Sequence, residues 1–207
     1  NLAVSLEVQG RLDEAEEACL EALKRRPNYP EAQLNLGNLR MRGGDAIGAV
    51  ECYATAVRLA PDNALAHANL SVALRELGEL EAADAQCQAA LALAPDSLEA
   101  QNALGNLRIA QGRYRAAADA FTEAVRLRPR SREARLNLAG AHFKSGNLEA
   151  AAAAYTEVIE LEGETADTQH GLGVVALADG RLDAAVAAFR KAVELRPEFG
   201  EAHYYLA

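Results

Sequence analysis

The chain has 207 residues, of which 50% are hydrophobic and 25% charged, and its formal net charge is -9 at pH 7. This composition is typical of a folded protein with a substantial core, and the acidic balance argues against general nucleic-acid binding, which needs a basic surface. No run of about 18 apolar residues indicates a membrane span. Three cysteines without CxxC spacing favour a reducing, cytoplasmic compartment over a disulfide framework or a zinc site.

Four series of residues recur every 34 residues along the chain. Glycine recurs from Gly10 to Gly180, and alanine recurs at a second position. A third position holds an aromatic residue or a cysteine, and a fourth holds proline, which Gly163 replaces once. Such a period predicts a repeat protein in which each unit is one supersecondary structure.

Each unit is predicted to form two helices. Helix A carries a core like "LNLGNL" and ends near the periodic glycine, whereas helix B has apolar residues at helical spacing and ends before proline. We expect one domain over residues 1–207, truncated at both ends, and no strands. Its repeats are 1–29, 30–63, 64–97, 98–131, 132–165, 166–199 and a partial repeat at 200–207.

This 34-residue pattern resembles the tetratricopeptide repeat family along the whole chain. The family's leucine–glycine pair occurs at Leu36-Gly37, Leu104-Gly105 and Leu172-Gly173, while the tryptophan that the family often carries early in helix A is absent. The resemblance implies an all-α, right-handed superhelical solenoid. It also implies that the A helices line a concave groove that holds extended peptides.

Asparagines recur on helix A although asparagine is a poor helix former. With proline numbered as position 32 of each repeat, positions 2, 6, 9 and 13 gather on the side opposite the buried face. An asparagine amide donates and accepts, so it can pair with any peptide backbone. The candidate peptide-binding residues on and beside this face are Asn35, Asn38, Arg42, Asn69, Glu76, Asn102, Asn106, Asn137, Lys144 and His170.

The asparagine series is similar to the ladder in the repeat arm of O-linked N-acetylglucosamine transferases, although Ala103 and Gly171 interrupt it. A structural interpretation stands beside the binding one: the amides satisfy carbonyl groups between adjacent A helices without a ligand. Both interpretations can hold at once. Binding predicts that alanine at Asn35, Asn69 and Asn137 spares stability and abolishes partner capture.

No nucleophile–base pair or metal-ligand spacing is present in the sequence, so we expect no catalysis, no cofactor and no metal site. Cys19 and Cys87 are predicted to be core residues. The favoured function is a non-catalytic scaffold that binds a protein or peptide, with no nucleic-acid or membrane partner. The alternatives are a substrate-recruiting arm of a larger enzyme such as a glycosyltransferase, or a structural spacer that self-associates end to end around Tyr204 and Tyr205.

Overall fold

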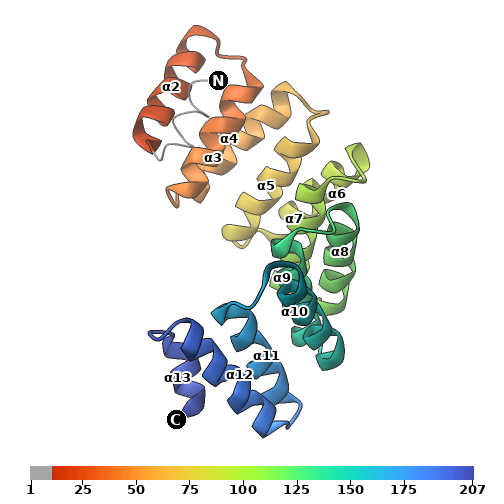
Figure 1. Cartoon of the computed structure of the whole chain (residues 1–207). Coiled ribbons are helices and arrows are strands. Elements are labelled where there is room, and N and C mark those ends of the chain that lie inside the picture. The colour runs from red at the N-terminus through yellow and green to blue at the C-terminus, as the bar shows by residue number, and fades with distance from the viewer. Residues whose placement is uncertain (1–10) are drawn as a thin grey trace. The chain divides into compact units, whose positions relative to one another are not determined.

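The computed structural model describes residues 11–207, which form helices joined by short turns (Figure 1). No strand occurs in this part of the chain, so the all-α prediction is confirmed. The helices alternate between the predicted A and B types. The chain divides into two compact units, residues 1–111 (unit 1) and 112–207 (unit 2). That all repeats form one continuous superhelix stays a prediction.

In unit 1, each helix packs against the next along the chain, and the A helices α5 and α7 also contact each other. The A helices of this unit are α3, α5 and α7, and the B helices are α2, α4 and α6. Their bounds are α2 Leu12–Arg25, α3 Pro30–Arg42, α4 Ala46–Leu59, α5 Ala64–Glu76, α6 Leu80–Leu93 and α7 Leu98–Ala110.

In unit 2, consecutive helices also pack against each other. Here α8, α10 and α12 are B helices and α9, α11 and α13 are A helices. Their bounds are α8 Tyr114–Leu127, α9 Arg132–Lys144, α10 Leu148–Glu162, α11 Ala166–Ala178, α12 Leu182–Leu195 and α13 Gly200–Leu206.

The periodic glycines make the turns that follow the A helices. Gly44 and Gly146 have φ values of 79° and 80°, a left-handed conformation that side chains with a Cβ rarely adopt. The B helices end before the periodic prolines, and several helices begin at a side-chain cap, such as Ser131 accepting from the Ala134 amide at 3.2 Å. The periodic residues therefore fix where each helix starts and stops. Gly10 lies outside the described residues.

A glycine in helix A makes room for the aromatic residue of helix B. A Cβ added to Gly37 would lie 2.5 Å from Tyr53 Cε1, and one added to Gly173 would lie 2.6 Å from Phe189 Cε1. Tyr53 and Phe189 are 2% and 1% exposed. The leucine–glycine pair of the sequence is thus a packing device that brings the two helices of one repeat together.

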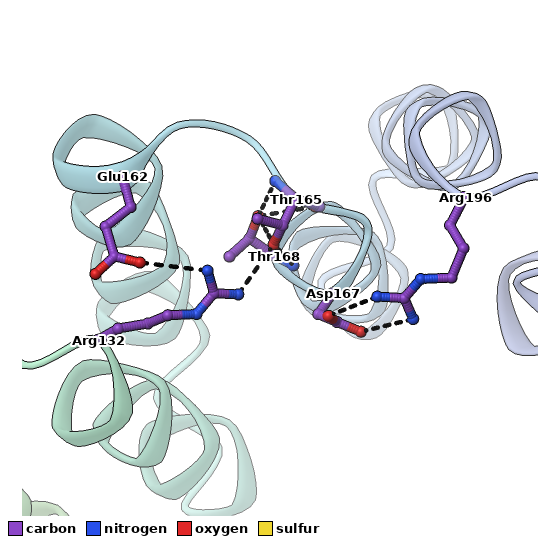
Figure 2. A network of polar contacts seen from close by, with 6 residues as sticks. All are labelled: Arg132, Glu162, Thr165, Asp167, Thr168 and Arg196. Atoms are coloured by element: carbon purple, nitrogen blue, oxygen red, sulfur yellow. Dashed lines mark hydrogen bonds and ion pairs between the residues drawn. The ribbon is translucent and has the colours of Figure 1, made fainter. Parts of the chain in front are cut away.

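Arg132 joins three helices at the repeat in which Gly163 replaces proline. Its guanidinium donates to Glu162 at the end of α10 (3.3 Å) and to the Thr165 hydroxyl at the start of α11 (3.2 Å), as Figure 2 shows. Thr165 and Thr168 cap α11 reciprocally. Polar contacts hold this junction where the chain lacks the usual proline.

Candidate functional site

A pocket of about 280 Å³ opens in unit 1 on the A helices α3 and α5. It brings together three of the predicted site residues, Asn38, Arg42 and Asn69, from two adjacent repeats. Its remaining lining residues are Met41, Tyr53 and Val72. We call it the α3–α5 pocket. It combines amide groups, a cation and an apolar wall, which is the mixture that a peptide with alternating polar and apolar groups needs.

The amide oxygen of Asn38 is the centre of the pocket's hydrogen bonding. It accepts from the Tyr53 hydroxyl at 2.8 Å and from Asn69 Nδ2 at 3.0 Å. An amide oxygen has two lone pairs, so these two donors use its full capacity. Among the described residues, the amide groups left for a ligand are the two N–H donors of Asn38 and the second N–H donor and the oxygen of Asn69.

This arrangement combines the two interpretations of the asparagines. Asn38 and Asn69 connect neighbouring A helices, because Asn69 Nδ2 donates to the side-chain carbonyl of Asn38, as the structural interpretation expected. Each such hydrogen bond contributes about 0.5–1.5 kcal/mol net. The same bonds hold the Asn38 donors in a fixed orientation. Asn69 therefore has a structural partner, and replacing it by alanine is expected to cost some stability.

The other candidates of unit 1 lie outside this pocket. Asn35 and Asn106 are half-buried on α3 and α7 and make no hydrogen bond with a described residue. Glu76 is exposed and accepts from Arg75 at 2.7 Å. The Oδ1 atom of Asn102 is buried without a hydrogen-bond partner among residues 11–207.

In unit 2 the candidates lie in three separate environments. Asn137 is half-buried on α9 without a hydrogen bond in the described part of the chain. The Lys144 Nζ lies 5.8 Å from the centroid of the Tyr114 ring. The His170 ring packs among aromatic rings, with centroid distances of 5.7, 5.1 and 5.8 Å to Phe189, Phe199 and Tyr205, and its Nε2 is 3.9 Å from Glu201.

The two interruptions of the asparagine series are buried. Ala103 is 3% exposed. A Cβ on Gly171 would lie 2.5 Å from Tyr155 Cζ, so the ring of α10 occupies the space that a longer side chain would need. The helical wheel predicted that position 6 of helix A faces outward in every repeat. Ala103 and Gly171 show that this position is buried in two of them.

The Tyr53 ring is buried, but its hydroxyl reaches the pocket and donates to Asn38, and Tyr53 was not predicted as a site residue from the sequence. A signal for this existed. A tyrosine at a position that also accepts phenylalanine carries a hydroxyl that needs a partner when buried. Val72 was placed on the correct face without being proposed as a site residue, and Met41 was missed.

Among the described residues, burial raises the pKa of two thiols and a phenol, whereas the hydrogen bond from Arg11 lowers the pKa of the exposed Glu14. Burial raises the pKa of the Cys87 thiol to about 11, and it raises the pKa of Cys52 and of Tyr155 as well. These groups are protonated at neutral pH, which does not suit a nucleophile. Cys19 and Cys87 are 2% and 0% exposed, so their prediction as core residues is confirmed.

Within residues 11–207, no cluster of three metal-ligating side chains occurs, and no helix combines the length and apolar character that a membrane span requires.

The tetratricopeptide repeat family matches residues 1–30, 34–97, 102–167 and 170–207. The chain is also 38% identical over 89 residues to the protein FlbA of Caulobacter vibrioides (strain ATCC 19089 / CIP 103742 / CB 15). That match covers 43% of this chain and 15% of FlbA, so the chain spans a small part of that relative.

Two solved structures share the fold at low sequence identity. PilW, a widely conserved type IV pilus biogenesis factor, is 22% identical with a TM-score of 0.92, covering 100% of this chain and 96% of PilW. YrrB, a TPR protein with an unusual peptide-binding site, is 20% identical with a TM-score of 0.71, covering 91% of this chain and 97% of YrrB. At these identities the likeness concerns the fold alone.

Proposed function

Because the chain belongs to the tetratricopeptide repeat family, we propose that it is a non-catalytic scaffold whose A helices bind an extended segment of a protein partner. The observation that carries this proposal is the α3–α5 pocket, where Asn38, Arg42 and Asn69 meet. The peptide-binding site named for YrrB is consistent with the same use of this fold.

The orientation of the amides defines what the pocket offers. Two donors already occupy Asn38 Oδ1, so the side-chain N–H groups of Asn38 are what this residue offers to a ligand. They suit a hydrogen-bond acceptor such as a peptide carbonyl. Asn69 Oδ1 makes no hydrogen bond with a described residue and can accept a peptide N–H. Met41 and Val72 form the apolar part of the lining and suit an apolar side chain next to those backbone groups. We expect the other half-buried asparagines, Asn35, Asn106 and Asn137, to extend the contact along the A helices.

The proposal is tested with peptides selected from a random display library against the whole chain. The variant Arg42→Gln/Val72→Thr changes the pocket lining and leaves the Tyr53–Asn38–Asn69 bonds in place. Arg58→Gln, at an exposed site on α4, is the matched control. We expect the pocket variant to bind the selected peptide at least about tenfold more weakly, a loss of about 1.4 kcal/mol. Equal affinities of the pocket variant, the control and the unmodified chain would overturn the proposal.

A second candidate is a recruiting arm within a longer protein, for instance an enzyme. The match to FlbA favours it, because the segment that matches this chain is 15% of a longer protein. The scaffold and the recruiting arm would both use the α3–α5 pocket. They differ in whether the natural protein carries a further domain. Purification of the natural protein followed by mass measurement distinguishes them: a mass well above 22.0 kDa with a second folded domain supports the arm, and a mass near that value excludes it.

The alternative of a self-associating spacer draws support from exposed aromatic side chains on α13. Tyr204 is 78% exposed and Tyr205 is 40% exposed. Sedimentation of the chain and of the Tyr204→Ser variant tests it. Association that grows with concentration and disappears in the variant supports the spacer, whereas a monomer at all concentrations excludes it. The buried cysteines Cys19, Cys52 and Cys87, which form no disulfide within the described residues, fit the reducing, cytoplasmic compartment that we propose for the protein.

A further inference from the structure

A second recess, in unit 2, has a different chemistry from the α3–α5 pocket. One pocket of about 440 Å³ is lined by the start of α8 and the end of α9, including Arg113, Tyr114, Arg115 and Lys144. A second pocket of about 560 Å³ also lies along α8 and α9 and shares Arg115 and Ser145 with the first. The two are therefore contiguous, and we call them together the α8–α9 groove.

Positive charge gathers in this groove without being neutralised. The side chains of Arg113, Arg115 and Lys144 are exposed, and none has an ion-pair partner in the described part of the chain. Lys144 lies over the Tyr114 ring. The single carboxylate in the lining is Asp119, in the second pocket. The whole chain carries a net charge of -9, so three uncompensated cations in one groove run against the general charge of the protein.

Other arginines of unit 2 contact carboxylates. Arg132 contacts Glu162 at 3.3 Å and Arg196 contacts Asp167 at 2.9 Å, as seen in Figure 2, and Arg181 contacts Asp179 at 2.6 Å. Arg113 and Arg115, like Arg128, Arg130 and Arg190, have no such contact among the described residues, but only Arg113 and Arg115 line a pocket together with a third cation. Their guanidinium groups keep their full donor capacity for a ligand.

Two other polar side chains of the groove already have hydrogen-bond partners. The Ser145 hydroxyl donates to the backbone carbonyl of His142 at 2.8 Å, and Asn147 Oδ1 accepts from the Ala150 amide as the cap of α10. Burial lowers the pKa of His142, so this side chain is neutral at pH 7. Recognition in the groove therefore depends on the three cations. The first turn of α8 adds positive partial charge, because no side chain caps it.

We propose that the α8–α9 groove binds an acidic segment of a protein partner, with side-chain carboxylates paired to Arg113, Arg115 and Lys144. Planar guanidinium forks match carboxylates in a bidentate geometry, and the Tyr114 ring offers an apolar wall beside them. The acidic surface elsewhere disfavours a nucleic acid, which needs a basic footprint larger than three residues. This site is separate from the α3–α5 pocket, and its test does not depend on whether that pocket binds a peptide.

The test uses the whole chain and two labelled peptides of equal length, one built from glutamate and glycine and one with glutamine in place of every glutamate. Fluorescence anisotropy is measured at about 50 mM and about 500 mM NaCl, since exposed ion pairs weaken as the Debye length shortens. We expect saturable binding of the glutamate peptide at low salt and its loss at high salt. The glutamine peptide is expected not to bind.

Two triple variants separate the groove from the overall charge. Arg113→Gln/Arg115→Gln/Lys144→Gln removes the three groove cations. Arg128→Gln/Arg130→Gln/Arg190→Gln is the matched control, because it removes three exposed cations that also lack ion-pair partners among residues 11–207. We expect the groove variant to weaken binding of the glutamate peptide by about tenfold, because it removes three exposed ion pairs. We expect the control to change it by less than about twofold. Circular dichroism checks that both variants fold.

Several results would overturn the proposal. One is an equal loss in the two variants, which indicates nonspecific attraction. Others are equal binding of the glutamate and glutamine peptides, and no saturable binding at low salt. Complete competition by inorganic phosphate at millimolar concentration assigns the groove to a small anion instead. Tighter binding of a single-stranded oligonucleotide, lost in the groove variant alone, assigns it to nucleic acid.

Discussion

Three corresponding repeat positions carry a hydrogen-bonded polar cluster in unit 1 and two glycines with a tyrosine in unit 2. In unit 1, positions 9, 24 and 6 hold Asn38, Tyr53 and Asn69, which are joined by hydrogen bonds. In unit 2, the corresponding residues of α9, α10 and α11 are Gly140, Tyr155 and Gly171. Both tyrosines come from the same place in helix B, yet only the hydroxyl of Tyr53 has a partner among the described residues.

The two tyrosine rings also have different neighbours on helix A. Gly37 leaves space on helix A of the same repeat, and the Tyr53 ring fills it. At the corresponding position of unit 2, Ala139 carries a Cβ, and the Tyr155 ring lies against Gly171 of the next repeat instead. The periodic residues thus build the same scaffold twice, while a few variable positions around the tyrosine differ: Gly37, Asn38 and Asn69 in unit 1, and Ala139, Gly140 and Gly171 in unit 2.

The largest expected difference between the units concerns the rings themselves. Tyr53→Ala removes a side chain that is 2% exposed and should lower the free energy of unfolding by about 3–5 kcal/mol. Tyr155→Ala should cost clearly less, because Tyr155 is half-buried and its neighbours can close in. Urea unfolding followed by circular dichroism measures both. Equal losses would contradict the different packing of the two rings.

Alkaline pH should lower the free energy of unfolding more through a group of unit 1 than through one of unit 2. Burial raises the pKa of Cys87 from 9.0 to about 11, so between these values the unfolded chain binds fewer protons than the native one. Stability should therefore be intact below pH 9 and fall by up to about 1.4 kcal/mol per pH unit above it. Cys87→Ala should flatten this slope more than Tyr155→Phe does. A slope that Cys87→Ala leaves unchanged would exclude the thiol as its cause.

Alanine at position 9 should have opposite effects in the two units. Asn38→Ala leaves the Tyr53 hydroxyl and Asn69 Nδ2 without their acceptor and should cost about 1–3 kcal/mol. Gly140→Ala should stabilise by up to about 1 kcal/mol, because alanine favours a helix and no atom lies within 4 Å of the added Cβ. Thermal or urea unfolding checks the two signs. Destabilisation in both cases would indicate that position 9 of unit 2 has a contact we have not described.

The smallest effect isolates a single hydroxyl. Tyr53→Phe should cost about 1 kcal/mol, since it removes the hydrogen bond to Asn38. Tyr155→Phe should be neutral or slightly stabilising, because the Tyr155 hydroxyl makes no hydrogen bond with a described residue and burial already raises its pKa. The same unfolding measurement compares them. A larger loss of unfolding free energy in Tyr155→Phe than in Tyr53→Phe would show that the Tyr53–Asn38 hydrogen bond does not stabilise the protein.

The sequence period predicted the helices, their turns and the core cysteines, because glycine, alanine and proline act through local backbone geometry and close packing. It also placed Asn38, Arg42 and Asn69 on one face, and they do line one pocket. A helical wheel describes a single helix, however, and contains no information on which neighbour reaches a given side chain. It therefore missed the Tyr53 hydroxyl, the inward position of Gly171 and the aromatic surroundings of His170.

The side-chain amide resonances of Asn38 and Asn69 test the central claim most directly. We predict that adding a selected peptide shifts the Asn38 Nδ2 protons and the backbone amides around Met41 and Val72, because the peptide accepts from Asn38 while the Asn38–Asn69 bond persists. Shifts confined to the B helices or to α13, with the Asn38 and Asn69 resonances unchanged at saturation, would contradict a binding role for the asparagines. They would leave these residues a purely structural role between α3 and α5.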